Sequence, residues 1–70
     1  MEFVIVTYPT KRSVRVDGVV TGSTDDVLQM DSGTHKFDLG DPLDYKPDFL
    51  EVVVEGTSVL APMRLAFGKK

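Results

Sequence analysis

The 70-residue chain contains no cysteine, no tryptophan and a single histidine. Without cysteine there is neither a disulfide framework nor a thiolate ligand for a metal, and one histidine cannot form a typical zinc site. We therefore expect neither a metal nor a cofactor. A chain this short also buries only a small core, so its stability must come from that core alone or from association with another chain.

The chain also lacks a long apolar run. No stretch approaches the ~20 residues that cross a bilayer, and residues 1–6 lack the charged start and long apolar middle of a signal peptide. We expect no membrane insertion. Two locations stay open: the cytoplasm if the chain is complete, and the cell surface or periplasm if it is cut from a larger parent.

Positive charge is sparse as well. Eight lysine and arginine residues are scattered among eleven acidic ones, the net charge is −3, and the pair Lys69-Lys70 is terminal. Domains that bind nucleic acids gather basic residues on one face or along one element. The charge pattern therefore predicts no nucleic-acid partner.

What the sequence does contain is a strong turn signal between two runs of strand-forming residues. A two-residue hairpin loop of type I′ needs positive φ at both central positions, which Gly18 adopts freely and Asp17 tolerates better than most residues. The predicted cross-strand pairs are Val16 with Val19, Arg15 with Val20, and Val14 with Thr21. Directly opposed residues share a face, so Val14, Val16 and Val19 should lie on one side.

Other strands are indicated by β-branched and aromatic residues in short runs bounded by turn residues. We expect them at residues 3–8, 27–30, 34–39, 49–54 and 57–67. Apolar residues on both faces of the first strand indicate a strand covered on both sides. A turn at Gly33 would join the strand at residues 27–30 to that at residues 34–39. Glu55-Gly56 would join the strands at residues 49–54 and 57–67, with Val54 opposite Thr57. Residues 40–48 hold two prolines and three aspartates and should be loop.

No segment shows a 3.6-residue apolar period, so we expect no helix. About seven short strands with regularly spaced turns predict an all-β fold, a small antiparallel β-sandwich formed by one domain over residues 1–70. The predicted structural turns are those at Asp17, Gly18, Gly33 and Gly56.

The order of these motifs resembles the PEGA domain, a small β module of bacterial and archaeal proteins. The segments that carry the resemblance are Val14-Arg15-Val16-Asp17-Gly18, Gly22-Ser23-Thr24, Ser32-Gly33-Thr34-His35-Lys36-Phe37 and Tyr45-Lys46-Pro47. The match covers residues 6–65. Pro9-Thr10-Lys11-Arg12-Ser13 replaces the signature Pro-Glu-Gly-Ala, and Asp25 stands where a proline is usual. The resemblance implies a module of larger exported or surface-associated proteins, in which Tyr45 packs with its ring buried and its hydroxyl bonded.

The chemistry of a catalytic site is not apparent. No G-x-S-x-G or other nucleophile signature occurs, and the sequence offers His35 no catalytic partner, so we interpret it as a structural histidine at the sheet edge and predict no catalytic residue and no enzyme activity. Asp25-Asp26 is interpreted as a solvated bend.

A ligand-binding module is the alternative function. Ca²⁺ prefers carboxylate and carbonyl oxygens on a flexible loop, and the chain offers Asp38, Asp41, Asp44 and Asp48, although not at EF-hand spacing. Tyr8, Tyr45 and Phe49 could present aromatic faces to a glycan.

The main hypothesis is a non-catalytic spacer, docking or assembly module. On the face of the last predicted hairpin opposite the core lie Phe49, Val53, Leu60 and Pro62. Small monomers rarely leave such a patch open. Either the termini or residues 40–48 cover it, or it contacts a protein partner, a neighbouring domain or a second copy, including by strand addition at an exposed edge.

Overall fold

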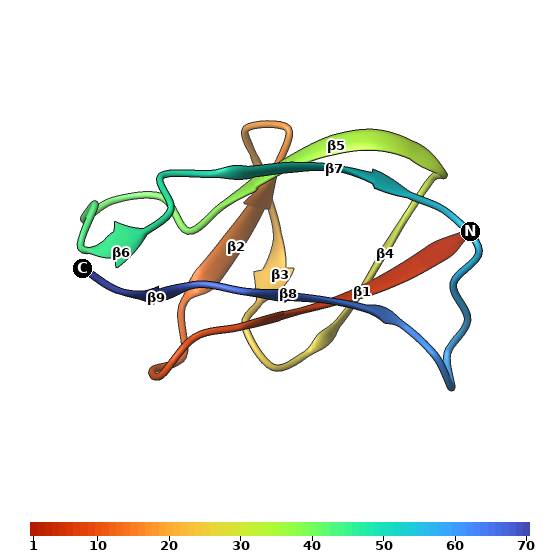
Figure 1. Ribbon diagram of the computed structural model, residues 1–70, viewed down its shortest axis with the longest axis horizontal. Coiled ribbons are helices and arrows are strands. Elements are labelled where there is room, and N and C mark those ends of the chain that lie inside the picture. The colour runs from red at the N-terminus through yellow and green to blue at the C-terminus, as the bar shows by residue number, and fades with distance from the viewer.

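Nine short strands and no helix make up the computed structural model, which describes residues 1–70 (Figure 1). The strands are β1 (Glu2–Thr7), β2 (Ser13–Val16), β3 (Val19–Ser23), β4 (Val27–Met30), β5 (Gly33–Asp38), β6 (Tyr45–Lys46), β7 (Leu50–Val54), β8 (Met63–Ala66) and β9 (Gly68–Lys69). The expected all-β class is confirmed. None of these elements is a helix that could cross a membrane.

The strands form three sheets. One has the order β4-β1-β8, the second β3-β2-β5-β7, and the third pairs only β6 with β9. All pairs are antiparallel except β1 with β8, which run parallel from the pair Val4 and Met63 to the pair Thr7 and Ala66. A wholly antiparallel sandwich was expected, so this pair is a correction. This pair places β1, the first strand, beside β8, which lies near the C-terminal end of the chain.

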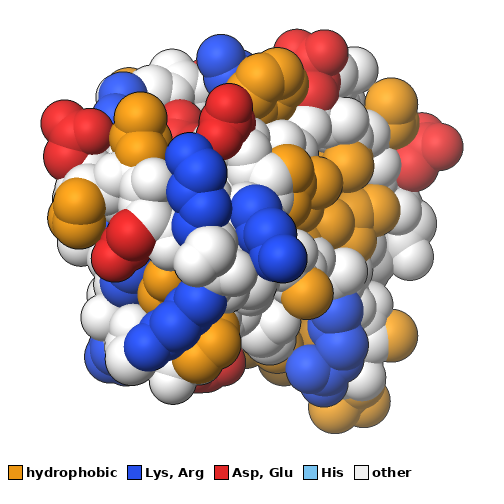
Figure 2. All heavy atoms as spheres, turned by 60° about the vertical axis from the view of Figure 1, so that its left-hand side comes forward, with side chains coloured by type: hydrophobic (Ala, Val, Ile, Leu, Met, Phe, Trp, Pro, Cys, Tyr) orange, Lys and Arg blue, Asp and Glu red, His pale blue; other side chains and the backbone are white.

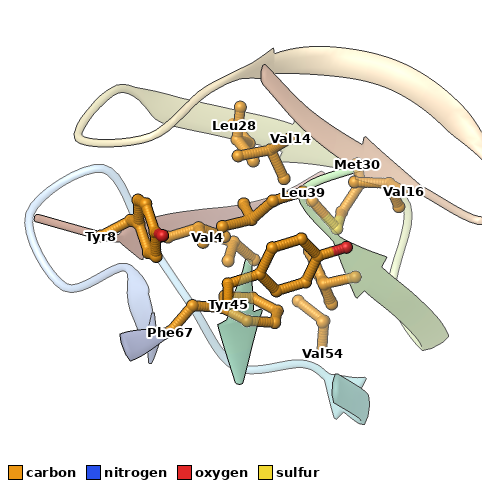
Figure 3. Packing of buried hydrophobic residues seen from close by; sticks show 12 residues of the cluster. Val4, Tyr8, Val14, Val16, Leu28, Met30, Leu39, Tyr45, Val54 and Phe67 are labelled. Carbon is orange, nitrogen blue, oxygen red and sulfur yellow. The ribbon is translucent and has the colours of Figure 1, made fainter. Parts of the chain in front are cut away.

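Both larger sheets supply alternate side chains to one core (Figure 3). The buried apolar residues are Val4, Val6, Tyr8, Val14, Val16, Leu28, Met30, Phe37, Leu39, Tyr45, Val54 and Phe67. The small sheet covers one end of this core, where the ring of Tyr45 meets that of Phe67 edge to face with centroids 5.5 Å apart. Burial of one such large side chain stabilises the fold by roughly 1.5–3 kcal/mol relative to exposure.

The predicted hairpin forms at Asp17-Gly18, where φ is 54° and 85°. Two of its three predicted pairs, Val16 with Val19 and Arg15 with Val20, are confirmed. The third is wrong: Val14 pairs with Gly22, because a bulge leaves Thr21 as an extra residue. A Cβ at Gly22 would lie 2.4 Å from Cδ2 of the buried Leu28. The bulge therefore brings a glycine, rather than Thr21, to this close contact.

The other two predicted hairpins do not form. β4 pairs with β1 rather than with β5, and β7 pairs with β5 while β8 pairs with β1. Gly33 (φ 129°), the first residue of β5, and Gly56 (φ 67°), in the connection after β7, do have positive φ. A turn residue shows that the chain changes direction, but burial decides which sheet the next strand joins. At both places the chain crosses from one sheet to the other.

Residues 40–48 are not loop throughout, contrary to the prediction. Tyr45 and Lys46 form β6 and pair with Lys69 and Gly68. The apolar ring of Tyr45, only 1% exposed, anchors this short ladder against the core. Packing of one aromatic side chain thus allows a two-residue ladder in a segment whose composition predicts none.

Gly18→Val tests the hairpin turn. A β-branched residue at φ 85° is strained, and we expect the free energy of unfolding to fall by about 1–3 kcal/mol. Thermal unfolding should show this as a drop in Tm of roughly 4–8 °C per kcal/mol. The control, Lys36→Ala at an exposed position, should lose only about 0.5 kcal/mol. Equal Tm values for the two variants would show that the turn does not need a glycine.

Candidate contact surface

The single histidine ties two turns together. Nδ1 of His35 lies 2.7 Å from Oδ2 of Asp17 in the β2–β3 turn, and Nε2 lies 2.7 Å from the carbonyl oxygen of Asp31, which precedes β5. Both partners can only accept hydrogen bonds, so the arrangement favours a ring protonated on both nitrogens. These bonds, that of Asp17 first, raise the pKa of His35 above its usual 6.5. His35, which was expected to be a structural residue at the sheet edge, therefore links the β2–β3 turn to the turn before β5. We call this pair of hydrogen bonds the His35 clamp.

Asp17 takes part in two further contacts at the same turn. Its Oδ1 accepts the backbone N–H of Lys36 at 2.9 Å, and its own N–H donates to the Lys36 carbonyl at 2.8 Å. The bond from the Lys36 amide, followed by that from His35, lowers the pKa of the Asp17 carboxyl below its usual 3.8. The hairpin tip is therefore attached to β5 through backbone and side chain alike.

Arg12 binds residues 39–44, the segment between β5 and β6. Its guanidinium lies 5.0 Å from the ring centroid of Tyr45 and 5.7 Å from that of Tyr8. It donates to Asp44 and to three backbone carbonyls, those of Leu39, Gly40 and Pro42. The side chain is only 12% exposed. Sequence reasoning missed this residue, because it stands in a polar connection far from every group that it binds.

The four aspartates considered as cation ligands are not brought together. Asp38 pairs with Arg15 at 3.5 Å and accepts the Gly40 N–H, while Asp44 pairs with Arg12. Asp41 and Asp48 are exposed and form no ion pair with either arginine. No group of three or more acidic, histidine or cysteine side chains could hold a metal ion, and the surface has no pocket. Two of the four carboxylates are used to hold the chain in place.

The aromatic residues considered for a glycan do not share a face. Tyr8 and Tyr45 are buried, with 7% and 1% exposure, and Arg12 lies against both rings. The Tyr45 ring is buried as expected, but the hydroxyl that forms a bond is that of Tyr8, which donates to the Asp44 carbonyl at 3.3 Å. Phe49 is exposed and lies under the Lys36 ammonium, 4.4 Å from its ring centroid. No pair of these rings is free to stack on one sugar.

The four predicted contact residues are accessible but separate. Phe49, Val53 and Leu60 are 48%, 53% and 97% exposed, and Pro62 is partly buried. They were expected on one face of a hairpin, which does not form. Phe49 precedes β7 and Val53 lies in it, whereas Leu60 and Pro62 belong to the connection before β8, which reaches the lower right of Figure 1.

The structure adds a third exposed position at β3. Val19 and Val20 are 65% and 64% exposed, although Val19 pairs with the buried Val16 and lies on the same face of the hairpin, as predicted. β3 is the terminal strand of its sheet, so it has a partner strand on one side only. The alternation of the sequence defines the face of Val19, but only the sheet order shows that the face is open there.

Comparison of the chain with protein-family models, with curated proteins and with solved structures finds no match.

The His35 clamp predicts a dependence of stability on pH. Because folding raises the pKa of His35, its stabilising effect is complete below about pH 6.5 and is lost as the pH rises through the folded-state pKa. Asp17, with a lowered pKa, stabilises above about pH 3.8 and loses this effect only at lower pH. Thermal unfolding at about pH 5.5 and about pH 8.5 should show a higher Tm at the lower pH. In His35→Gln the difference should shrink, and an unchanged difference would assign it to other groups.

Arg12→Lys tests the organising role of the guanidinium. Lysine keeps the charge but cannot reach four acceptors as a planar fork, and a hydrogen bond to a charged group contributes about 1.5–3 kcal/mol. We expect denaturant unfolding to show a loss of about 2 kcal/mol or more, with Arg64→Lys, at an exposed arginine outside the ion pairs, as the matched control. Similar losses in both variants would contradict the assignment.

Proposed function

We propose that the protein is a non-catalytic contact module, similar to a PEGA domain, which serves as a spacer, docking or assembly unit for a protein partner, a neighbouring domain or a second copy. The observation that carries this proposal is the exposure of large apolar side chains on strands and on a hydrogen-bonded turn. Among them are Val19 and Val20 on β3, Val53 on β7, and Val59 and Leu60 in the turn before β8.

The turn at Leu60 illustrates why such residues favour contact. The backbone groups of Ser58 and Ala61 bond each other at 3.1 and 3.2 Å, and the Ser58 hydroxyl accepts a further bond from the Ala61 N–H. Leu60 at its tip is 97% exposed and Val59 is 63% exposed. Covering a leucine would contribute roughly 1.5–3 kcal/mol. A turn that is already closed loses little further entropy when a partner covers it.

The positions of the chain ends support a role between other segments. The N-terminus and the C-terminus lie at opposite ends of the long axis, which measures 30 Å (Figure 1). Within a longer chain, a module with this arrangement would hold its two neighbouring segments apart. This fits the modular proteins in which PEGA domains occur.

Site-specific photo-crosslinking tests the proposal in the cells that make the protein. A photoreactive residue replaces Val20, Val53 or Leu60 in turn, and replaces the exposed Thr10 as the control. We expect an adduct of defined mass from at least one apolar position and none from Thr10. A second copy would give an adduct at twice 7.7 kDa.

The adduct must also depend on the apolar contact. For each photoreactive position an exposed apolar neighbour is changed, as Val19→Asp for position 20, Phe49→Asp for position 53 and Val59→Asp for position 60. Each change should remove the adduct while the far-ultraviolet circular dichroism of the purified variant stays native. If no apolar position gives an adduct, or if Thr10 gives the same ones, the protein is not a contact module of this kind.

A further inference from the structure

Among the strands that end the two larger sheets, β7 has the longest ladder without a bulge. β7 makes five consecutive pairs with β5, from Val54 opposite Gly33 to Leu50 opposite Phe37, without a bulge. Outside this ladder, residues 49–55 take part in no hydrogen bond within the chain. The backbone groups on the far side of β7 are therefore unpaired, as in edges that accept an added strand.

The edge at β3 is less suited to pairing. A bulge at Thr21 interrupts its ladder, and the Thr21 hydroxyl donates to the Val19 carbonyl at 3.0 Å. Bulges and irregular hydrogen bonding are common devices that keep edges from pairing with other chains. β7 carries no such device and no proline.

Apolar side chains are incompletely covered on the same side as this edge. β3 and β4 contact each other, so β7 and β8, at the other ends of their sheets, lie on the opposite side of the core. The partly buried hydrophobic residues that pack against the core all lie on these two strands, namely Leu50, Val52, Met63 and Leu65. Figure 2 shows hydrophobic side chains gathered at its right, the side that faces the viewer in Figure 1. We call this side of the core, which carries Leu50, Val52, Met63 and Leu65, the open side.

The charged residues in β7 and beside it, at positions 48–55, are all acidic. Asp48, Glu51 and Glu55 are exposed, and none of them takes part in an ion pair. Along the strand, Leu50 and Val52 point toward the core, whereas Glu51 and Val53 point outward. A strand added to this edge would therefore meet the apolar side chains of Leu50 and Val52 on its inner face, and Glu51 and Val53 on its outer face.

We propose that an extended segment of a partner protein, alternating apolar and basic residues, adds as a strand to the free edge of β7. Its backbone would pair with β7, its apolar residues would cover Leu50 and Val52 on the open side, and its lysine or arginine side chains would lie beside Glu51. This inference rests on the proposed contact function and names the partner's chemistry. A second copy is disfavoured as the occupant, because its own residues 48–55 would bring three more carboxylates to the same edge.

The test uses synthetic peptides of about nine residues and the intact protein. Fluorescence anisotropy compares a peptide alternating valine and lysine with one of the same charge whose central valine is proline, and with one alternating valine and glutamate. We expect the first to bind at least about tenfold more tightly than the other two, because proline removes a backbone donor and glutamate repels the acidic edge. Backbone amides of residues 50–54 should become protected from hydrogen exchange.

Charge reversal provides the second measurement. Glu51→Lys combined with Glu55→Lys should weaken the lysine peptide at least about tenfold and strengthen the glutamate peptide. Asp26→Lys combined with Asp41→Lys makes the same change of net charge away from β7 and should weaken the lysine peptide by less than about threefold.

Several results would overturn the inference. Equal binding of the proline peptide would mean that the peptide is attracted by charge alone. Amide protection at β3 or β8 instead of β7 would place the partner at another strand. Pairing of β7 with a second copy of the chain would contradict a basic peptide segment as the occupant. If neither peptide nor crosslink engages β7 while position 20 or 60 forms adducts, this inference fails and the contact function stands. If no position forms an adduct, the function itself fails.

Discussion

The pairing of β1 with strands from two distant parts of the chain is the constraint on which the fold depends. β1 lies in the centre of its sheet, antiparallel to β4 and parallel to β8. A parallel pair cannot be joined by a tight turn, so the intervening chain must leave this sheet, build the other one and return. The only hairpin between consecutive strands is that of β2 and β3. The rest of the core forms from contacts distant in sequence, and each sheet needs the other to bury its inner face.

The side chains of Arg12 and His35 hold the connections that this topology requires. Arg12 lies against the rings of Tyr8 and Tyr45 and binds the segment before β6, while His35 joins the hairpin tip to the turn before β5. The buried Thr24 has a similar role with hydroxyl chemistry, because its Oγ1 accepts from the Arg12 N–H and donates to the Thr10 carbonyl. Two of the four aspartates that suggested ligand binding, Asp38 and Asp44, are thus occupied within the chain. Glu51 of β7 forms no ion pair, and the apolar residues at the strand edges are exposed.

The combination of open edges and a small core gives the contact hypothesis its physical basis. Four strands face three across the core, and the partly buried hydrophobic side chains that pack against it lie on β7 and β8, where the two sheets end. The connection from β3 to β4 depends on the backbone of one residue. Asp25 has φ 64° and donates its N–H to the Val6 carbonyl at 2.8 Å, and a proline at this position could do neither.

Local chemistry in the sequence determined the helix-free class, the Asp17-Gly18 turn with two of its three pairs, and the extent of β4, because turn preference and strand propensity act over a few residues. Only the tertiary structure decided that β4 pairs with β1, that β8 runs parallel to it, and that Tyr45 begins a ladder, because these depend on burial between segments far apart in the chain. The same holds for the candidate surface. The sequence identified Phe49, Val53 and Leu60 as surplus apolar residues, but their division between two regions, and the exposure of Val19, depend on which strands end each sheet. A pattern of alternation defines the faces of a strand, whereas the order of strands in a sheet determines which faces and edges stay uncovered.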